Sequence, residues 1–547
     1  MRVIADVEVP LRDGTQIVAD VFLPDDEGPH PTLVALSPYG KEIQSLDVPP
    51  QPPTSPVYAR EIEAGDPRFL TAHGYAHVIA DERGIGKSGG TYRGWMSPQE
   101  AEDGYDVVEW AAAQPWSDGG VGMVGVSYYG AIQLAVAALA PPSLRAIMPI
   151  NAPADFYREG THHGGILHAF FLLIYQTCVG GRLESEVVAE SSEEELAAII
   201  ARLADDPDLK LYPGLYNIAL NPERQVGFFD VLAHPLDGPF YWARSAYRAY
   251  DRIKIPFYTG SGWWAYAHMH LRGAFQHYAE IDAPKKLYIE SRVEADAPMD
   301  EAYNAEVVRW YDHWLKGVEN GIMDEPPIRV HVRGRGFRDE QEWPLAGTDW
   351  RKLHLRRFGA LTVEPEPVKG YPDTFVQQPV QEQPRVASLD YLTSPQSEDV
   401  ELIGPAAATV FAALDAEDTN WMVSLLDVYP DGMEVELTRG FLKASHRAVD
   451  EERSDPWRPW HPHTDSEPVV PGEIEQYRIE LSPLSTVIRA GHRIKLSISC
   501  MDHAHWPPID PELGTGHQPW HVCRNETVSH TVFHDAGRPS HVLLPFV

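Results

Sequence analysis

The sequence predicts an α/β domain followed by an all-β domain, within a chain of 547 residues. Strand-like and helix-like segments alternate over the first 150 residues. The strands there are near-continuous apolar runs, which is typical of a parallel sheet with helices on both faces. After about residue 325, short alternating strands separated by Pro, Gly and Asp predict a β-sandwich or jelly roll.

The α/β part is expected to occupy residues 1–151 and 253–325. Strands are predicted at "IVADVFLP", "TLVALSPY", "AHVIADERG", "GVGMVGVS" and "RAIMPI". "DGYDVVEWAAAQPW" has apolar residues at helical spacing after Asp103, a suitable N-cap, and "YYGAIQLAVAALA" predicts a mostly apolar helix. The alternation resumes with "IPFYTGSGWW", "LRGAFQHY", "KKLYIES" and "NAEVVRWYDHWLKGV".

Residues 152–252 interrupt this alternation and show no strand pattern. "SSEEELAAIIARLADD" predicts an amphipathic helix with a capping box from Ser192 to Glu195, flanked by aromatic segments that contain histidine. We expect a helical cap over the C-terminal edge of the sheet. Residues 326–547 are expected to form the β domain, with strands such as "IRVHVRG", "RKLHLRR", "AATVFAALD", "MVSLLDVYP", "EQYRIELSP" and "HRIKLSISC".

Charge and cysteine content restrict the classes of partner. The 45 basic and 80 acidic side chains give a net charge of −35, which disfavours nucleic acid and anionic membrane surfaces. The longest apolar run, "HAFFLLIY", is too short to span a bilayer. Three separated cysteines and an N-terminus without signal-peptide features suggest a reducing, cytoplasmic location. We expect a small-molecule substrate and neither metal nor cofactor, and a homodimer stays open.

The stretch "VGVSYYGA" places Ser127 on a predicted strand-to-helix turn, where α/β-hydrolases present a nucleophile. The usual spacing is G-x-S-x-G, and here one more residue separates Ser127 from Gly130. The backbone N–H of Tyr128 would face an oxyanion at the start of the following helix. Tyr39, in "SPYGK" at the end of an earlier strand, could supply a second donor through its hydroxyl. The alternative for Ser127 is a buried serine in a glycine-rich turn.

These segments, in their order, resemble the cocaine esterase-like (CocE/NonD) hydrolases, relatives of the X-Pro dipeptidyl peptidases. The similarity extends over nearly the whole chain, through "ADVFLP", "SPYGK", "RGIGKSGG", "GVGMVGVSYYGAIQLAVA", "RWYDHWLKG" and "AGHRIKLSIS…DPELGTG". The resemblance implies an α/β-hydrolase core, a helical cap and a C-terminal jelly roll of the galactose-binding type. It also implies a serine nucleophile at Ser127, with oxyanion donors from Tyr39 and the Tyr128 N–H.

The same resemblance indicates a degenerate catalytic triad. The family's Asp is expected after the glycine-tryptophan motif, where this chain has Trp263, Trp264 and then Ala265. The family's His aligns with Glu294 in "LYIESRVEADAP". A serine hydroxyl is a weak nucleophile without a base, so these losses matter. Glu294 could accept a proton only if burial raised its pKa, and the alternative is a solvated loop acid.

Other histidines are candidate replacements for the missing base. His268 and His270 are two residues apart at a predicted helix start and so do not share a face, and helix-surface or core roles are favoured for both. His162 and His163 are expected to roof the pocket and contact substrate rather than relay protons. Trp263, Trp264 and His268 are further candidate substrate contacts. No group of residues has a spacing typical of metal ligands.

Three functions therefore stay open. We favour a repurposed hydrolase fold in which the pocket, the oxyanion donors and Glu294 promote a non-hydrolytic step on a bulky apolar molecule, such as cyclisation, carbon–carbon bond formation or elimination, in secondary metabolism. The second is ester or amide hydrolysis through Ser127 with an unusual base. The third is an inactive protein that binds a small molecule. Aromatic residues of the expected cap suit an apolar ligand: Phe170, Phe171, Tyr175, Phe240, Tyr241 and Trp242.

Overall fold

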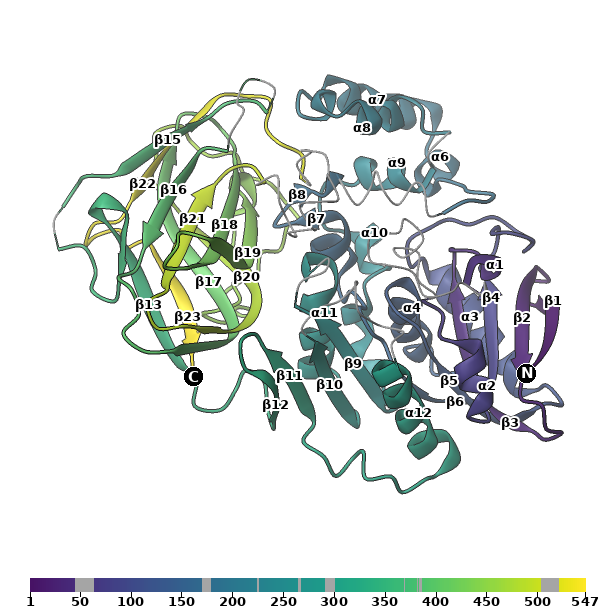
Figure 1. Ribbon diagram of the computed structural model, residues 1–547. Helices are drawn as coiled ribbons and strands as arrows, with labels where there is room; N and C mark the ends of the chain where they lie inside the picture. Colours follow the sequence, from purple (N-terminus) through teal and green to yellow (C-terminus); the bar gives the residue numbers. More distant parts are fainter. Residues whose placement is uncertain are drawn as a thin grey trace.

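The computed structural model describes residues 1–44, 63–169, 179–223, 226–263, 267–290, 301–367, 369–380, 382, 386–502 and 521–547. The α/β core, the cap and the β domain predicted from the sequence all form, and the β domain lies beside the core (Figure 1). No described helix is long and apolar enough to cross a membrane.

The core contains one mixed sheet with the strand order β1-β2-β4-β3-β5-β6-β9-β10-β11-β12. The pairings from β4 to β11 are parallel, and those at the two ends are antiparallel. The strands are β1 (Arg2–Pro10), β2 (Gln16–Leu23), β3 (His30–Ser37), β4 (Ala76–Asp81), β5 (Ser117–Met123), β6 (Leu144–Ile147), β9 (Phe257–Gly262), β10 (Lys285–Glu290), β11 (Ile328–Val332) and β12 (Gly336–Glu340). The segment "IRVHVRG", expected in the β domain, instead pairs as β11 with β10 of the core.

Helices cover both faces of this sheet, as the apolar strands predict. One apolar cluster joins α3 and α4 to the sheet, and another joins α2 and α12 to its opposite face. The bounds are α1 (Lys41–Gln44), α2 (Pro67–Ala72), α3 (Pro98–Ala112), α4 (Tyr128–Ala137), α11 (Ala267–Glu280) and α12 (Glu301–Lys316). The start of α3 differs from the prediction: Ser97 is its N-cap, and Asp103 lies inside the helix. Pro98 is suited to the first helical position, so the helix begins earlier than the apolar pattern suggests.

The cap lies over the end of the sheet and consists mainly of short helices (Figure 1). Its α7 has the predicted capping box, in which the backbone N–H of Ser192 donates to Glu195 at 2.8 Å. A small hairpin, β7–β8, was not predicted. The elements are η2 (Phe156–Thr161), β7 (His162–His163), β8 (Ile166–Leu167), α6 (Glu186–Glu190), α7 (Glu193–Asp205), η3 (Leu209–Leu211), α8 (Pro213–Leu220), α9 (Val226–Ala233), α10 (Pro239–Trp242) and η4 (Ala246–Arg252).

The β domain is a single sheet with the order β15-β22-β17-β20-β19-β18-β21-β16-β14-β13-β23, and the additional β17–β23 pairing closes it into a barrel. Alternate side chains of its long strands point into one large apolar core. The elements are β13 (Asp349–Arg356), η5 (Arg357–Gly359), β14 (Ala360–Thr362), β15 (Asp373–Gln377), β16 (Ser388–Leu392), β17 (Val400–Leu414), β18 (Asn420–Val428), β19 (Glu434–Lys443), η6 (Ala444–His446), β20 (Glu475–Ile488), β21 (Arg493–Ser499), β22 (Val528–Phe533) and β23 (His541–Phe546).

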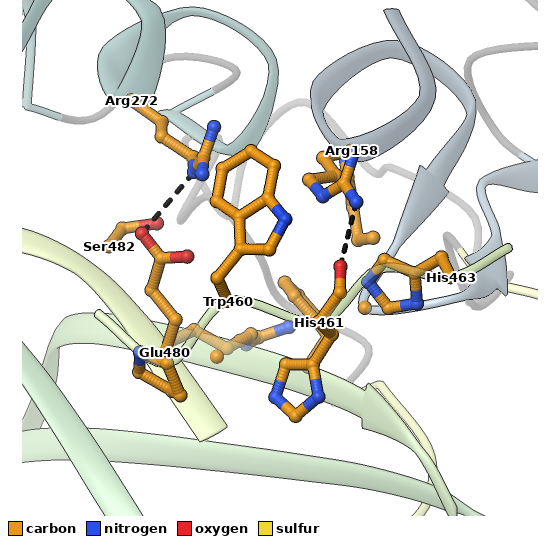
Figure 2. A pocket seen from close by; sticks show the side chains of 13 residues that line it. Arg158, Arg272, Trp460, His461, His463, Glu480 and Ser482 are labelled. Carbon is orange, nitrogen blue, oxygen red and sulfur yellow. Dashed lines mark hydrogen bonds and ion pairs between the residues drawn. The ribbon is translucent and has the colours of Figure 1, made fainter. Parts of the chain in front are cut away.

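The cap, helix α11 and the β domain meet around a cavity of about 80 Å³. Trp460 of the β domain lies between Arg158 of the cap and Arg272 of α11 (Figure 2). Arg158 Nη2 donates to the His461 carbonyl at 2.7 Å, and Arg272 Nε donates to Glu480 at 3.2 Å. These cation–π contacts and charge-assisted bonds hold three parts of the chain against one another.

Candidate active site

Ser127 occupies a tight turn between β5 and α4, at the C-terminal edge of the parallel sheet. Its backbone has φ 59° and ψ −115°, which is strained for a residue with a side chain. Its N–H donates to the Ile150 carbonyl at 2.9 Å. Close packing requires the flanking glycines, because a Cβ at Gly130 would lie 2.4 Å from that carbonyl oxygen. The turn therefore has the conformation of a nucleophile elbow, with the half-buried Ser127 at its tip.

His270 is the described basic side chain beside Ser127. Its Nε2 lies 3.4 Å from Ser127 Oγ, long for a hydrogen bond but within the range of catalytic pairs without substrate. His270 is buried, and burial lowers its pKa from the usual 6.5 to about 4. The imidazole is therefore neutral near pH 7 and can accept a proton.

A helix-surface or core role was expected for His270, whereas the structure places it beside Ser127. It lies in the first turns of α11, directly after β9, whose C-terminal end is at the same sheet edge as Ser127. Helical side chains lean toward the helix N-terminus, so a residue at this position points back to that edge. The position of the helix start relative to β9 was the signal that could have identified His270.

Tyr128 follows Ser127 at the start of α4, and Tyr39 packs against the Tyr128 ring. Tyr128 is the first residue of α4, so its backbone N–H belongs to the helix N-terminus beside Ser127. The rings of Tyr39 and Tyr128 pack edge to face, with centroids 5.8 Å apart. Tyr39 is half-buried, and a donor role for its hydroxyl stays a prediction.

The side chain of Tyr128 points away from the turn into a buried polar network. Its hydroxyl donates to Glu100 and is 2.8 Å from the Tyr92 hydroxyl. Glu100 also accepts the backbone N–H of Ser97 at 2.8 Å, and its carboxyl contacts that of Glu82. Burial raises the pKa of both glutamates. The sequence did not reveal this pair, because Glu100 belongs only to the capping box of α3 and nothing in the sequence indicates that Glu82 meets it.

His162 and His163 are buried at the junction of cap and β domain, and their described hydrogen bonds go to protein atoms. His162 Nδ1 bonds the Thr161 hydroxyl at 2.9 Å. His163 Nδ1 lies 2.8 Å from His521 Nε2, and His163 Nε2 lies 2.9 Å from the Glu159 carbonyl. The contacts show a structural role for both, and substrate contact stays a prediction.

Trp263 is part of the core, where its indole N–H donates to the His331 carbonyl at 2.6 Å. Its ring packs with Phe275, so the exposed fraction is only 6%. Glu294, Trp264 and Ala265 lie outside the described residues, as does the side chain of His268. Within the described chain, no group of three or more His, Cys, Asp or Glu side chains is arranged to hold a metal ion.

An apolar cluster extends from the nucleophile turn into the cap. Trp95 and Tyr128 pack in it with Phe156 of η2, and Tyr39 and Met269 lie at its partly buried margin. The rings of Trp95 and Phe156 stack with centroids 5.8 Å apart. An aromatic core therefore connects the cap with Tyr128, the residue that follows Ser127.

Comparison with known proteins identifies the family. Residues 13–292 match the X-Pro dipeptidyl-peptidase (S15 family) domain, and residues 320–543 match the X-Pro dipeptidyl-peptidase C-terminal non-catalytic domain. Cocaine esterase of Rhodococcus sp. (strain MB1 Bresler) is 26% identical over 625 aligned positions, which cover 100% of this chain and 98% of that protein.

Solved structures agree in fold. A CocE/NonD family hydrolase from Staphylococcus aureus has a TM-score of 0.79 at 24% identity and covers 100% of this chain and 94% of its own. An aminopeptidase from a marine sediment Thaumarchaeota archaeon has a TM-score of 0.76 at 18% identity, covering 99% and 96%. With a domain match over more than half its length, this chain belongs to the S15 family of X-Pro dipeptidyl-peptidase and cocaine esterase-like hydrolases.

Proposed function

We propose that this protein is a serine hydrolase that cleaves an ester or amide of a small molecule with a bulky apolar group. The observation that supports it is the 3.4 Å separation of Ser127 Oγ and His270 Nε2 at the tip of a strained strand-to-helix turn. The aromatic cluster on the cap side favours an apolar group in the substrate. The relative named cocaine esterase supports an ester.

In this proposal His270 takes the proton of the Ser127 hydroxyl while the oxygen attacks the substrate carbonyl. The Tyr128 N–H and the Tyr39 hydroxyl bind the oxyanion that forms. His270 then gives its proton to the leaving group, and an acyl-serine remains. Water, deprotonated by the same imidazole, attacks the acyl group and restores Ser127.

A non-hydrolytic step, favoured from the sequence, is the second candidate. It is supported by Ala265 and Glu294 at the positions where the family resemblance implies Asp and His. The low pKa of His270, about 4, also supports it, because such an imidazole is a weaker base than an ordinary histidine. In that case the oxyanion donors would polarise a carbonyl without a covalent acyl intermediate.

Turnover of an activated ester with an apolar acyl group separates the candidates. Hydrolysis predicts measurable turnover that is lost by at least about 10³-fold in Ser127→Ala and in His270→Ala. His277→Ala removes another buried imidazole of the same helix and serves as the control, with a far smaller effect. If the wild-type protein hydrolyses none of a panel of such esters, the hydrolase proposal is contradicted.

A further inference from the structure

Two buried carboxyl groups lie beneath Tyr128, whose N–H is the proposed oxyanion donor. Glu82 follows β4 directly and is 1% exposed, and Glu100 stands in the first turn of α3 and is 5% exposed. The two side chains contact each other. Two adjacent carboxylates cannot both keep their charge away from water, so one of them should hold a proton.

The hydrogen bonds indicate which group is charged. One oxygen of Glu100 accepts the Ser97 N–H and the other accepts the Tyr128 hydroxyl, so both act as acceptors. No N–H group of the described chain donates to either oxygen of Glu82. Glu100 is therefore the carboxylate, and Glu82 is the acid whose proton faces it.

The surrounding charges keep the proton on the pair. Besides Glu100, the strongest charges acting on Glu82 are those of Asp103 and Asp81. Arg83 makes two bonds of 2.7 Å to Asp103, and its remaining bonds go to Asp13 and Thr15. Asp81 accepts the Lys41 backbone N–H, and burial raises its own pKa to about 7. Burial raises the pKa of the Tyr92 phenol, and the described bonds of Tyr92 and Tyr128 bring no cation to the pair.

We propose that Glu82 and Glu100 share one proton and that this acid–carboxylate pair holds the Tyr128 side chain, and with it the oxyanion-binding N–H, in position. Both glutamates are positioning residues, since they act through Tyr128. The inference rests on the proposed function for its effect on rate, but the shared proton itself does not depend on it.

Loss of the proton from Glu82 should lower the reactivity of Ser127. Ionised Glu82 would repel the Glu100 carboxylate, which anchors Tyr128, and would place a second negative charge beneath the oxyanion. If only the protonated pair is competent, Ser127 reactivity falls about tenfold per pH unit above the pKa of Glu82. Glu82→Gln keeps a neutral hydrogen-bond donor at the same place and should remove this fall.

The test compares wild type, Glu82→Gln and Glu102→Gln by two methods. Glu102 is an exposed glutamate of the same helix and serves as the matched control. At neutral pH, the infrared spectrum of wild type minus that of Glu82→Gln should show a protonated carboxylic acid band, whereas wild type minus Glu102→Gln should show none. The rate of Ser127 modification by a fluorophosphonate, measured against pH, should give a Glu82→Gln to wild-type ratio that rises with pH.

The two readings distinguish this inference from the proposed function. An unchanged acid band in Glu82→Gln overturns the shared proton, whatever the activity. A lost band with parallel pH profiles overturns the positioning role. If the fluorophosphonate does not modify wild-type Ser127, the serine hydrolase proposal fails and the positioning role fails with it, while the infrared band still decides the shared proton.

Discussion

At the scale of single residues, the proposed chemistry depends on the pair formed by Ser127 and His270. Burial disfavours the charged imidazole, so the pKa of His270 falls to about 4. A depressed pKa keeps the basic, neutral form down to acidic pH, but it also makes that form a weaker proton acceptor. The site should therefore be slow at neutral pH and unusually tolerant of acid.

The pH–rate profile tests this directly. We expect the acid limb of kcat/KM for ester hydrolysis to lie near pH 4, because His270 becomes protonated only there. Steady-state kinetics between acidic and neutral pH would measure it. An acid limb near pH 6.5, about the ordinary pKa of histidine, would show that the base is a solvated imidazole and not the buried His270.

Tyr39 gives a second prediction at this scale. If its hydroxyl binds the oxyanion, Tyr39→Phe should lower kcat by about 10²-fold with little change in KM. Tyr371→Phe, which removes the hydroxyl of a 67% exposed tyrosine, is the control and should leave the kinetics unchanged. If KM instead rises by the same factor while kcat stays constant, Tyr39 contributes to substrate binding.

Residue motifs predicted the strand-to-helix turn at Ser127 but not the histidine beside it. Ser127 was evident because glycine spacing determines the turn locally. His270 was not, because its role depends on which turn of α11 reaches the sheet edge, and this is decided by how the chain leaves β9. Glu82 and Glu100 were not apparent either, since they meet only after α3 packs beside β4.

At the scale of elements, close packing of α11 at Gly273 holds His270 in position. Gly273 lies one turn beyond His270, and a Cβ there would lie 2.3 Å from the Ala152 carbonyl oxygen and 2.9 Å from Glu159 Oε2. Glu159 belongs to the π-helical η2, accepts the backbone N–H of Asp155 at 3.2 Å, and has a pKa that burial raises to about 8. At Gly273, helix α11 therefore packs directly against backbone atoms and a buried carboxyl group, which leave no room for a larger side chain.

We expect Gly273→Ala to displace α11 and His270 with it. A shift of about 1 Å at a catalytic base can lower kcat by up to about 10²-fold. Ala279→Leu adds larger bulk to an exposed position of the same helix and should have little effect. Ester kinetics with both variants, supported by circular dichroism, would measure this, and normal turnover of Gly273→Ala would contradict it.

At the scale of the whole molecule, a buried polar chain joins the cap to the β domain. The Glu159 carbonyl can only accept, so His163 Nε2 must donate to it, and the neutral His163 then accepts from His521 through Nδ1. His521 Nδ1 faces Asp502 at 2.9 Å. Burial alone would raise the pKa of Asp502, but His521 and Arg439 hold it well below its usual range. His521 therefore bridges His163 of the cap and the Asp502 carboxylate of the β domain.

Removing the charge of Asp502 should therefore loosen the cap from the β domain. Asp502→Asn replaces the buried carboxylate that Arg439 and His521 contact by a neutral amide, and we expect the free energy of unfolding to fall by about 3 kcal/mol. Calorimetry would show a lower Tm, with the β domain and the core separating into two transitions. Asp399→Asn breaks an exposed pair with Arg489 and should change Tm far less. Equal shifts in the two variants would contradict the proposed role of this chain.

The architecture was largely predictable from the sequence because alternation of strand and helix, followed by short strands alone, specifies the layers. The assignment of "IRVHVRG" differed from the structure because a short alternating strand has the same pattern at the edge of either sheet. β11 pairs with β10 through tertiary contacts that periodicity does not contain.

The central claim is that Ser127 is a nucleophile activated by His270. Mass spectrometry of the protein after reaction with a fluorophosphonate tests it most directly, because the reagent modifies a serine whose proton a neighbouring base removes during attack, and the adduct can be mapped to a peptide. The account predicts one phosphonyl group on Ser127 in wild-type protein, and a rate at least about 10²-fold lower in His270→Gln. An unmodified Ser127 in folded wild-type protein, or equal rates in the two proteins, would contradict it.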